Sequence, residues 1–182
     1  MLLFLRRSWK LLSMDTNTEL SSKENINILI SMCMLGVPCR YNGKAIHNIN
    51  DLINKYPKVN FIPVCSEQLG GLPTPRLPAE IIHGAGDDVI NNNANVVNES
   101  GVDVTDNFIK GSECVLSLAK KYLVKIFIGC ANSPSCSCSK IYDGNFKGIL
   151  EEGLGVTSAL LKQNGIQIIE IKEFDELYAN NS

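Results

Sequence analysis

The sequence predicts a single α/β domain with a mainly parallel sheet flanked by helices, in a Rossmann-like arrangement. Two observations support this fold class. Short apolar runs alternate along the chain with segments whose apolar residues recur at helical spacing, which is typical of parallel sheets with right-handed crossovers. In addition, 182 residues, of which 45% are hydrophobic and 20% charged, fit one globular domain with a substantial core.

Four short apolar runs are the predicted strands, and in chain order they cover residues 26–31, 60–64, 124–130 and 166–171. The loops that follow the first two, residues 32–43 and 65–76, contain glycines and prolines that predict a fixed shape, and residues 141–148 are turn-rich. Crossovers return each parallel strand in the same direction, so the carboxyl ends of the strands share one edge of the sheet. Ligands of such sheets bind at that edge, and we expect the site there.

Helices are predicted over residues 49–56, 106–121, 157–163 and 174–178. Pro57 ends the first of them. Thr105 or Asp106 is the expected N-cap of the second, and Gly165 is the expected C-cap of the third. Residues 86–98 alternate only weakly between apolar and polar, and we predict a polar hairpin on the surface.

Composition and charge exclude several classes of partner. The formal net charge is −2 and no cluster of lysine or arginine stands out, so no nucleic acid polymer is expected, whereas a free nucleobase needs no basic patch. No apolar stretch approaches the length of a membrane span, so no membrane partner is expected. The apolar start precedes Arg6 and Arg7, the reverse of a secretory signal. We therefore predict a cytoplasmic protein with a poorly ordered appendage, residues 1–24, before one domain, residues 25–182.

Three of the seven cysteines follow predicted strands, and this coincidence is the strongest functional signal in the sequence. Cys33, Cys65 and Cys136 come shortly after the first, second and third strands. An isolated buried cysteine is usually an inert small hydrophobe. Three thiolates at one edge of a sheet instead favour a soft metal or an iron–sulfur cluster. Three protein ligands also leave one metal position open, which is typical of a catalytic rather than a structural metal.

The other cysteines have weaker claims to this site. Cys114 lies on the apolar face of a predicted helix and is expected in the core. Cys130 either packs or supports the site, and Cys39 and Cys138 are close enough in sequence to replace a ligand. No paired Cys-x-x-Cys spacing of a structural zinc site is present.

Two polar residues near these cysteines are candidates for catalysis. Glu67, two residues after Cys65, is the nearest carboxylate and would move protons; its alternative role is a solvated loop residue or a helix cap. Ser133 would hydrogen-bond a substrate or a cluster sulfur, or would only shape a turn. His47 and His83 lie away from these motifs and are expected on the surface.

Several motifs, in order, resemble those of the thiouracil desulfidase-like family DUF523. They are Ser-Met-Cys-Met-Leu-Gly-Val-Pro-Cys-Arg-Tyr at 31–41, Pro-Val-Cys-Ser-Glu at 63–67, Gly-Gly-Leu-Pro-Thr-Pro-Arg at 70–76 and Ser-Pro-Ser-Cys at 133–136. Residues 141–144 and 155–157 fit the C-terminal pattern of the family, and the likeness runs from about residue 28 to residue 171.

The resemblance implies a non-redox desulfidase that converts 2-thiouracil to uracil with a [4Fe-4S] cluster. It places the cluster on Cys33, Cys65 and Cys136, with one iron free to take the substrate sulfur. It implies an acid/base role for Glu67, assisted by Ser133. The family usually has glycine after the last cysteine, where this chain has Ser137 and then Cys138, which would crowd the loop or add a ligand.

Two other functions use the same residues. One is a sulfur carrier or binding protein whose cluster stores or delivers sulfide without turnover on a base. The other, ranked lowest, is a zinc hydrolase with the same three thiolates.

Overall fold

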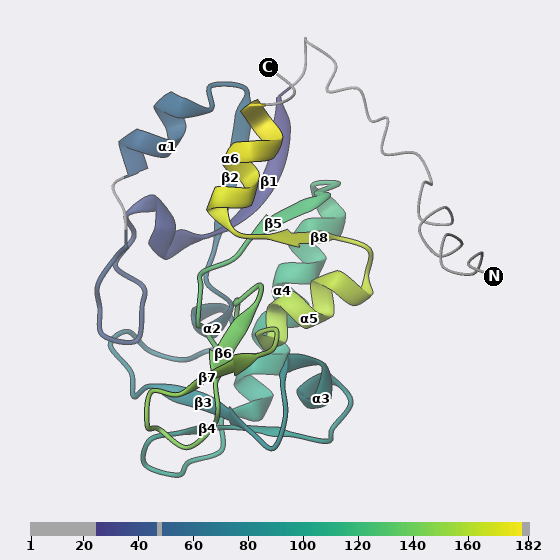
Figure 1. The fold of residues 1–182 in the computed structure, drawn as a ribbon. Helices are drawn as coiled ribbons and strands as arrows, with labels where there is room; N and C mark the ends of the chain where they lie inside the picture. The colour runs from purple at the N-terminus through teal and green to yellow at the C-terminus, as the bar shows by residue number, and fades with distance from the viewer. Residues whose placement is uncertain (1–24, 47–48, 180–182) are drawn as a thin grey trace, which may run out of the picture.

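The computed structural model describes residues 25–46 and 49–179, so the predicted appendage and His47 lie outside the described residues (Figure 1). A four-stranded parallel sheet has the order β2-β1-β5-β8. Its strands are β1 (Ile26–Ser31), β2 (Val59–Val64), β5 (Ile126–Ile128) and β8 (Gln167–Ile169). The predicted α/β fold with a mainly parallel sheet is confirmed.

Helices α1 and α6 cover one face of this sheet, and α4 and α5 cover the other (Figure 1). The helical elements of the described residues are η1 (Met32–Leu35, 3-10), α1 (Ile49–Lys55), α2 (Ser66–Leu69), α3 (Gly86–Ile90), α4 (Thr105–Lys121), α5 (Val156–Gln163) and α6 (Ile171–Ala179). None of the helices within the described residues is long and apolar enough to cross a membrane.

Strand β1 is apolar on both faces because it lies between two layers of helices, as parallel strands usually do. Its Ile28 and Ile30 belong to one core cluster with residues of α1 and α6, including Phe174. Leu29, on the opposite face, packs in a second cluster with residues of α4 and α5, including Val115. The near-continuous apolar sequence of β1 therefore reflects burial on both sides.

The prediction of a surface hairpin at 86–98 is wrong. Residues 86–90 form α3, in which Val89 is fully buried and the Asp88 carboxylate accepts the Ala85 N–H at 2.9 Å. Strand β4 (Asn95–Asn98) instead pairs antiparallel with β3 (Ala79–Ile82), a strand that the sequence did not indicate. The weak alternation was misleading because one buried valine anchors a short helix here.

The turn-rich segment 141–148 is part of a second small hairpin. Strand β6 (Lys140–Tyr142) pairs antiparallel with β7 (Leu150–Glu152). Residues 143–149 form the loop between them. This loop borders the site described below.

The predicted helix ends are partly correct. Val104, not Thr105 or Asp106, occupies the N-cap of α4, because the Thr105 hydroxyl accepts the Val96 N–H and the Thr105 N–H is bound by Asp103. Gly165 follows the C-cap residue of α5, with a left-handed φ of +77° that suits glycine. The last predicted strand is shorter than 166–171 and the last helix longer than 174–178, because residue 171 already opens α6.

Candidate active site

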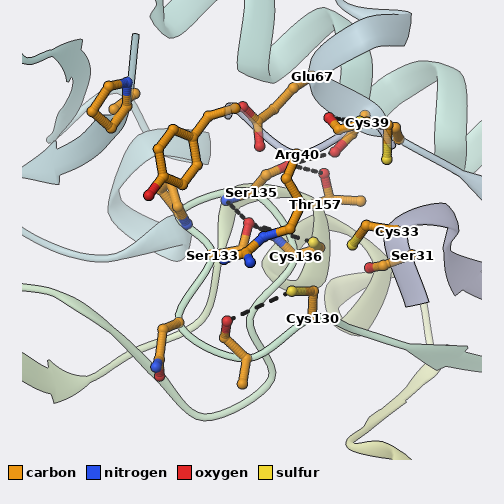
Figure 2. A pocket seen from close by; sticks show the side chains of 18 of the residues that line it. Ser31, Cys33, Cys39, Arg40, Glu67, Cys130, Ser133, Ser135, Cys136 and Thr157 are labelled. Carbon is orange, nitrogen blue, oxygen red and sulfur yellow. Dashed lines mark hydrogen bonds between the residues drawn. The ribbon is translucent and has the colours of Figure 1, made fainter. Parts of the chain in front are cut away.

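A cavity of about 380 Å³ lies at the carboxyl ends of β1, β2 and β5. Its size is in the range of small-molecule sites. Five thiols line it: Cys33, Cys39, Cys65, Cys130 and Cys136. Figure 2 shows the side chains of Cys33, Cys130 and Cys136 pointing toward one another. The three cysteines predicted from the strand ends therefore line one cavity, and two further thiols join them.

Each predicted thiol is held by a different short element. Cys33 lies in η1, which ends at Gly36 with a left-handed φ of 82°. Cys65 is the N-cap residue of α2, directly after β2. Cys136 lies in the loop that follows β5. The parallel direction of the strands thus converts a wide separation in sequence into proximity.

Two glycines allow the loop of Cys136 to approach the neighbouring backbone. A Cβ atom at Gly129 would lie 2.0 Å from the Cys136 carbonyl oxygen, and one at Gly155 would lie 2.5 Å from the Ser135 carbonyl carbon. The Thr157 N–H, at the start of α5, donates to the Ser135 carbonyl at 2.8 Å. The loop is therefore fixed between the end of β5 and the first turn of α5.

The five thiols perturb each other's ionisation. Hydrogen bonding to Cys130 and Cys39, together with burial, raises the pKa of Cys33. Hydrogen bonding to Cys39 and burial raise the pKa of Cys65, and hydrogen bonding to Cys130 and burial raise that of Cys136. Hydrogen bonds with Cys33 and Cys65 lower the pKa of Cys39. Several negatively charged thiolates in one buried cavity repel one another unless a cation binds between them. Such a group of thiols is therefore typical of a metal–thiolate centre.

The donor chemistry fits an iron–sulfur cluster. All seven described cysteines are free thiols, which soft iron favours as ligands. Within the described part of the chain, no group of three or more His, Cys, Asp or Glu side chains is arranged to hold a metal ion. A cluster differs from a single ion because its thiolates bind separate irons.

Buried hydroxyl groups connect two of the segments that carry these thiols. The Ser66 hydroxyl, next to Cys65, shares a hydrogen bond with the Ser135 hydroxyl, next to Cys136. Thr157 Oγ1 lies 3.5 Å from Ser135 Oγ, and all three hydroxyl side chains are buried. This contact fixes the turn of Cys65 relative to the loop of Cys136.

Ser133 lines the cavity and shapes the loop at the same time. Its Oγ accepts the N–H of Ser135 at 3.2 Å and the N–H of Cys136 at 3.3 Å. The Cys136 thiol lies 3.4 Å from the same oxygen. The Ser133 hydrogen bond acts to lower the pKa of Cys136, against the larger effects of Cys130 and burial that raise it, so the hydroxyl is placed to stabilise a sulfur that carries charge.

Glu67 also lines the cavity, where it forms an ion pair with Arg76. The Arg76 Nε to Glu67 Oε2 distance is 2.6 Å, and the two side chains are only 6% and 15% exposed, respectively. Burial disfavours the charged form of Arg76 and by itself would lower its pKa. The hydrogen bond with Glu67 and the charge of Glu67 act in the opposite direction, and the pKa of Arg76 is raised. Arg76 also donates to the Cys39 carbonyl at 3.1 Å. Glu67 is therefore neither a solvated loop residue nor a free carboxylate.

The departure from the family pattern at Ser137 and Cys138 leaves the cavity unaffected. The Ser137 hydroxyl turns away and donates to the Lys140 carbonyl at 2.5 Å. The Cys138 thiol donates to the Ile169 carbonyl at 3.2 Å, and burial raises its pKa to about 12. Neither side chain lines the cavity, so the structure does not place Cys138 as a ligand.

Two remaining predictions concern residues far from the cavity. His83 is exposed, as predicted. Cys114 is only half-buried on α4 and belongs to none of the three core clusters of the described residues, so its prediction as a core residue is wrong. The inward face of α4 is instead occupied by residues such as Val115 and Phe108.

Sequence reasoning missed Arg76 and the hydroxyl contact of Ser66 with Ser135, and it left open whether Cys130 packs or supports the site, whose cavity Cys130 lines. Arg76 is the one cationic residue of the motif 70–76, which follows Glu67 in the sequence. A cation in the motif after a candidate catalytic carboxylate could have suggested that the two side chains form an ion pair. The serine contact had no such signal, because the two residues are 69 positions apart.

The fold and the thiol-lined cavity define an α/β protein with a soft-metal site at the carboxyl ends of a parallel sheet. The family model described as 2-thiouracil desulfurase matches residues 28–173. The chain belongs to this family. The predicted recognition is therefore confirmed.

Two individual proteins are similar to this chain. YbbK of Bacillus subtilis (strain 168), an uncharacterized protein, is 43% identical over 152 residues, which cover 82% of this chain and 99% of YbbK. The solved structure of TudS, a [4Fe-4S]-dependent thiouracil desulfidase, superposes with a TM-score of 0.70 at 36% identity and covers 87% of this chain and 97% of TudS.

Proposed function

We propose that this protein is a non-redox desulfidase that removes sulfur from a thiolated nucleobase, converting 2-thiouracil to uracil with a [4Fe-4S] cluster. One observation carries the proposal: in a chain of the 2-thiouracil desulfurase family, cysteines from three strand ends line one cavity together with Glu67 and Ser133. The similarity to TudS, a [4Fe-4S]-dependent desulfidase, supports the same cofactor here.

Cys33, Cys65 and Cys136 would hold the cluster through one thiolate each. A cluster held by these three residues would supply Lewis-acid chemistry toward the thiocarbonyl sulfur of the substrate. Cys39 and Cys130 line the same cavity, so they are the residues against which this ligand set must be tested.

Glu67 is assigned the movement of a proton from the attacking water. Arg76 binds its Oε2, whereas Oε1 receives no hydrogen bond from a described residue, so one carboxylate oxygen is fixed and the other can accept a proton. General base catalysis of this kind contributes a factor of about 10² to 10⁴ in rate. The water oxygen would bond to the carbon that bears sulfur, the C–S bond would then break with its electron pair on sulfur, and the two water protons would leave with the sulfur, so the products are uracil and H₂S.

Ser133 is assigned a helper role beside the sulfur. Its oxygen is occupied by two backbone N–H groups, which fix the hydroxyl next to Cys136. The hydroxyl proton can then donate to the substrate or to a sulfur atom such as that of Cys136. Such fixed donors stabilise charge that develops during reaction.

The test is anaerobic purification followed by iron and sulfide analysis and an assay for uracil release from 2-thiouracil. We expect about four irons per chain, as the [4Fe-4S] type requires, and multiple turnovers. Iron-loaded protein that accumulates sulfide without releasing uracil would instead identify a sulfur carrier. Bound zinc without iron would contradict the proposal.

A further inference from the structure

Glu80 is a buried carboxylate that faces the same cavity. It lies on β3, where the neighbouring Ile81 points into a core cluster and Glu80 points to the opposite side. Glu80 is only 7% exposed and lines the cavity that the cysteines also line. Carboxylates are almost never this buried unless they are paired.

The described residues do not pair Glu80 fully. Its Oε2 accepts the N–H of Phe146 at 2.9 Å, from the loop between β6 and β7. The ion pairs of the described residues do not include Glu80, and its Oε1 receives no hydrogen bond from them. Glu80 Oε1 is not among the fully buried, unpartnered polar atoms of the described residues, so it is open to the cavity and can receive a hydrogen bond from a ligand.

Aromatic residues line the cavity together with Glu80. Phe146 has a left-handed φ of 55°, and its N–H bond to Glu80 holds it there. Tyr142, at the end of β6, and Tyr41, in the loop after η1, line the cavity as well. Flat aromatic faces stack favourably on planar heterocycles such as nucleobases. A carboxylate beside aromatic rings suits a planar ring that carries N–H donors.

We infer that Glu80 recognises the nucleobase by accepting a hydrogen bond from a ring N–H on its free Oε1. An ionised carboxylate is only an acceptor, and uracil and 2-thiouracil both carry ring N–H donors. Sites built to hydrogen-bond a polar group reject analogues that lack it. Glu80 is thus a specificity-determining residue rather than a catalytic one. This inference rests on the proposed function for the identity of the ring.

The variant Glu80→Gln separates recognition from support of the loop. The amide oxygen of glutamine can still accept the Phe146 N–H and preserve the loop. The glutamine NH₂ group then takes the place of Oε1. Because NH₂ is a donor, it cannot accept a hydrogen bond from the ring N–H. We expect unchanged iron and sulfide content and melting temperature. Glu113→Gln is the matched control, because Glu113 is an exposed carboxylate on α4 that does not line the cavity.

Binding is measured by calorimetry on the cluster-loaded protein with uracil, 1-methyluracil and 3-methyluracil, none of which has sulfur to lose. For the parent protein, we expect one of the two methylated bases to bind at least about tenfold more weakly than uracil. For Glu80→Gln, we expect uracil binding to be about tenfold to a hundredfold weaker than in the parent, and the methylated base to bind no more weakly than uracil. Equal binding of all three bases to the parent protein, absence of uracil binding, or an unchanged affinity in Glu80→Gln would overturn the inference.

Turnover of 2-thiouracil by the same samples keeps the two proposals distinguishable. Uracil binding that depends on Glu80, in a parent protein that releases no uracil from 2-thiouracil, supports the recognition role and contradicts desulfuration. Normal turnover in Glu80→Gln with an unchanged KM contradicts the recognition role and leaves desulfuration intact.

Discussion

Seven chemically identical side chains occupy three different environments in this protein. Cys33, Cys65 and Cys136 line the cavity with two neighbours, Cys138 is directed to a backbone carbonyl, and Cys114 lies half-buried on a helix. The surroundings of a thiol, rather than its presence, therefore decide its expected chemistry.

We predict that Cys33→Ser, Cys65→Ser and Cys136→Ser each lose the cluster, because a serine oxygen is a poor ligand for soft iron. Cys114→Ser is the control and should keep iron and sulfide. Elemental analysis of anaerobically purified protein measures the outcome. A Cys65→Ser protein with parental iron content, together with iron loss in Cys39→Ser or Cys130→Ser, would show that a different trio holds the cluster.

Cys138→Gly should keep both the cluster and activity. The Cys138 thiol faces the Ile169 carbonyl and lies outside the cavity lining, and its raised pKa keeps it protonated at neutral pH. Iron content and uracil release are the measurements. Loss of iron in this variant would identify Cys138 as a ligand.

Glu67→Gln should bind iron and sulfide as the parent does but release uracil at least about a hundredfold more slowly. The amide oxygen can still accept the Arg76 Nε–H, so the local structure is retained, whereas an amide cannot take a proton from water. Glu113→Gln, at an exposed position of α4, is the matched control. Near-parental turnover in Glu67→Gln would remove this residue from the mechanism.

At the scale of elements, the site depends on contacts between short segments that have little stability alone. Helix α2 has only four residues, and it is anchored where the backbone of Ser66 meets Gly111 of α4. A Cβ atom at Gly111 would lie 1.9 Å from the Ser66 carbonyl oxygen. Close backbone packing and the hydroxyl contact of Ser66 with Ser135 together position the turn of Cys65.

Ser135→Ala should lower the free energy of unfolding by about 1–3 kcal/mol, because it leaves the buried Ser66 hydroxyl without this partner. Loss of the contact should also speed the release of iron to a chelator. Ser117→Ala, at an exposed position of α4, should change neither quantity. Thermal melting and chelator challenge measure the effects; equal iron release in both variants would show that the hydroxyl contact does not position the site.

At the scale of the whole molecule, an aromatic group on one face of the sheet shares a core cluster with the cavity thiols but does not itself line the cavity. Phe174 of α6 packs against Tyr56, with ring centroids 5.0 Å apart, on a face of the sheet covered by α1 and α6. Phe61 and Tyr178 extend this aromatic group. None of these four residues lines the cavity.

Phe174→Ala should lower the free energy of unfolding by about 3–5 kcal/mol, because it opens a hole in a packed aromatic cluster. The protein that remains folded at low temperature should still hold its cluster and turn over 2-thiouracil. Leu177→Ala, at a position 38% exposed on the same helix, should cost much less. Denaturant unfolding checks the first point, and a specific activity per iron below that of the parent would contradict the second.

The sequence by itself determined the parallel sheet and the edge at which its site lies. Apolar runs followed by glycine- and proline-containing loops are local patterns, and crossover handedness then brings the strand ends together. This reasoning is enough to place Cys33, Cys65 and Cys136 at one cavity, as the structure confirms. The motifs shared with the family added the assignment of Glu67 and Ser133, which remains a prediction.

Only the tertiary structure decided which side chains meet across long separations. The contacts of Arg76 with the Cys39 carbonyl and of Phe146 with Glu80 join segments 37 and 66 residues apart, so no local pattern encodes them. The sequence did not predict strand β3, because this four-residue strand is stabilised by its pairing with β4 rather than by a sequence pattern of its own. Hydrogen bonds and ion pairs depend on distances of a few ångströms, which are fixed by packing of the whole chain rather than by the order of its residues.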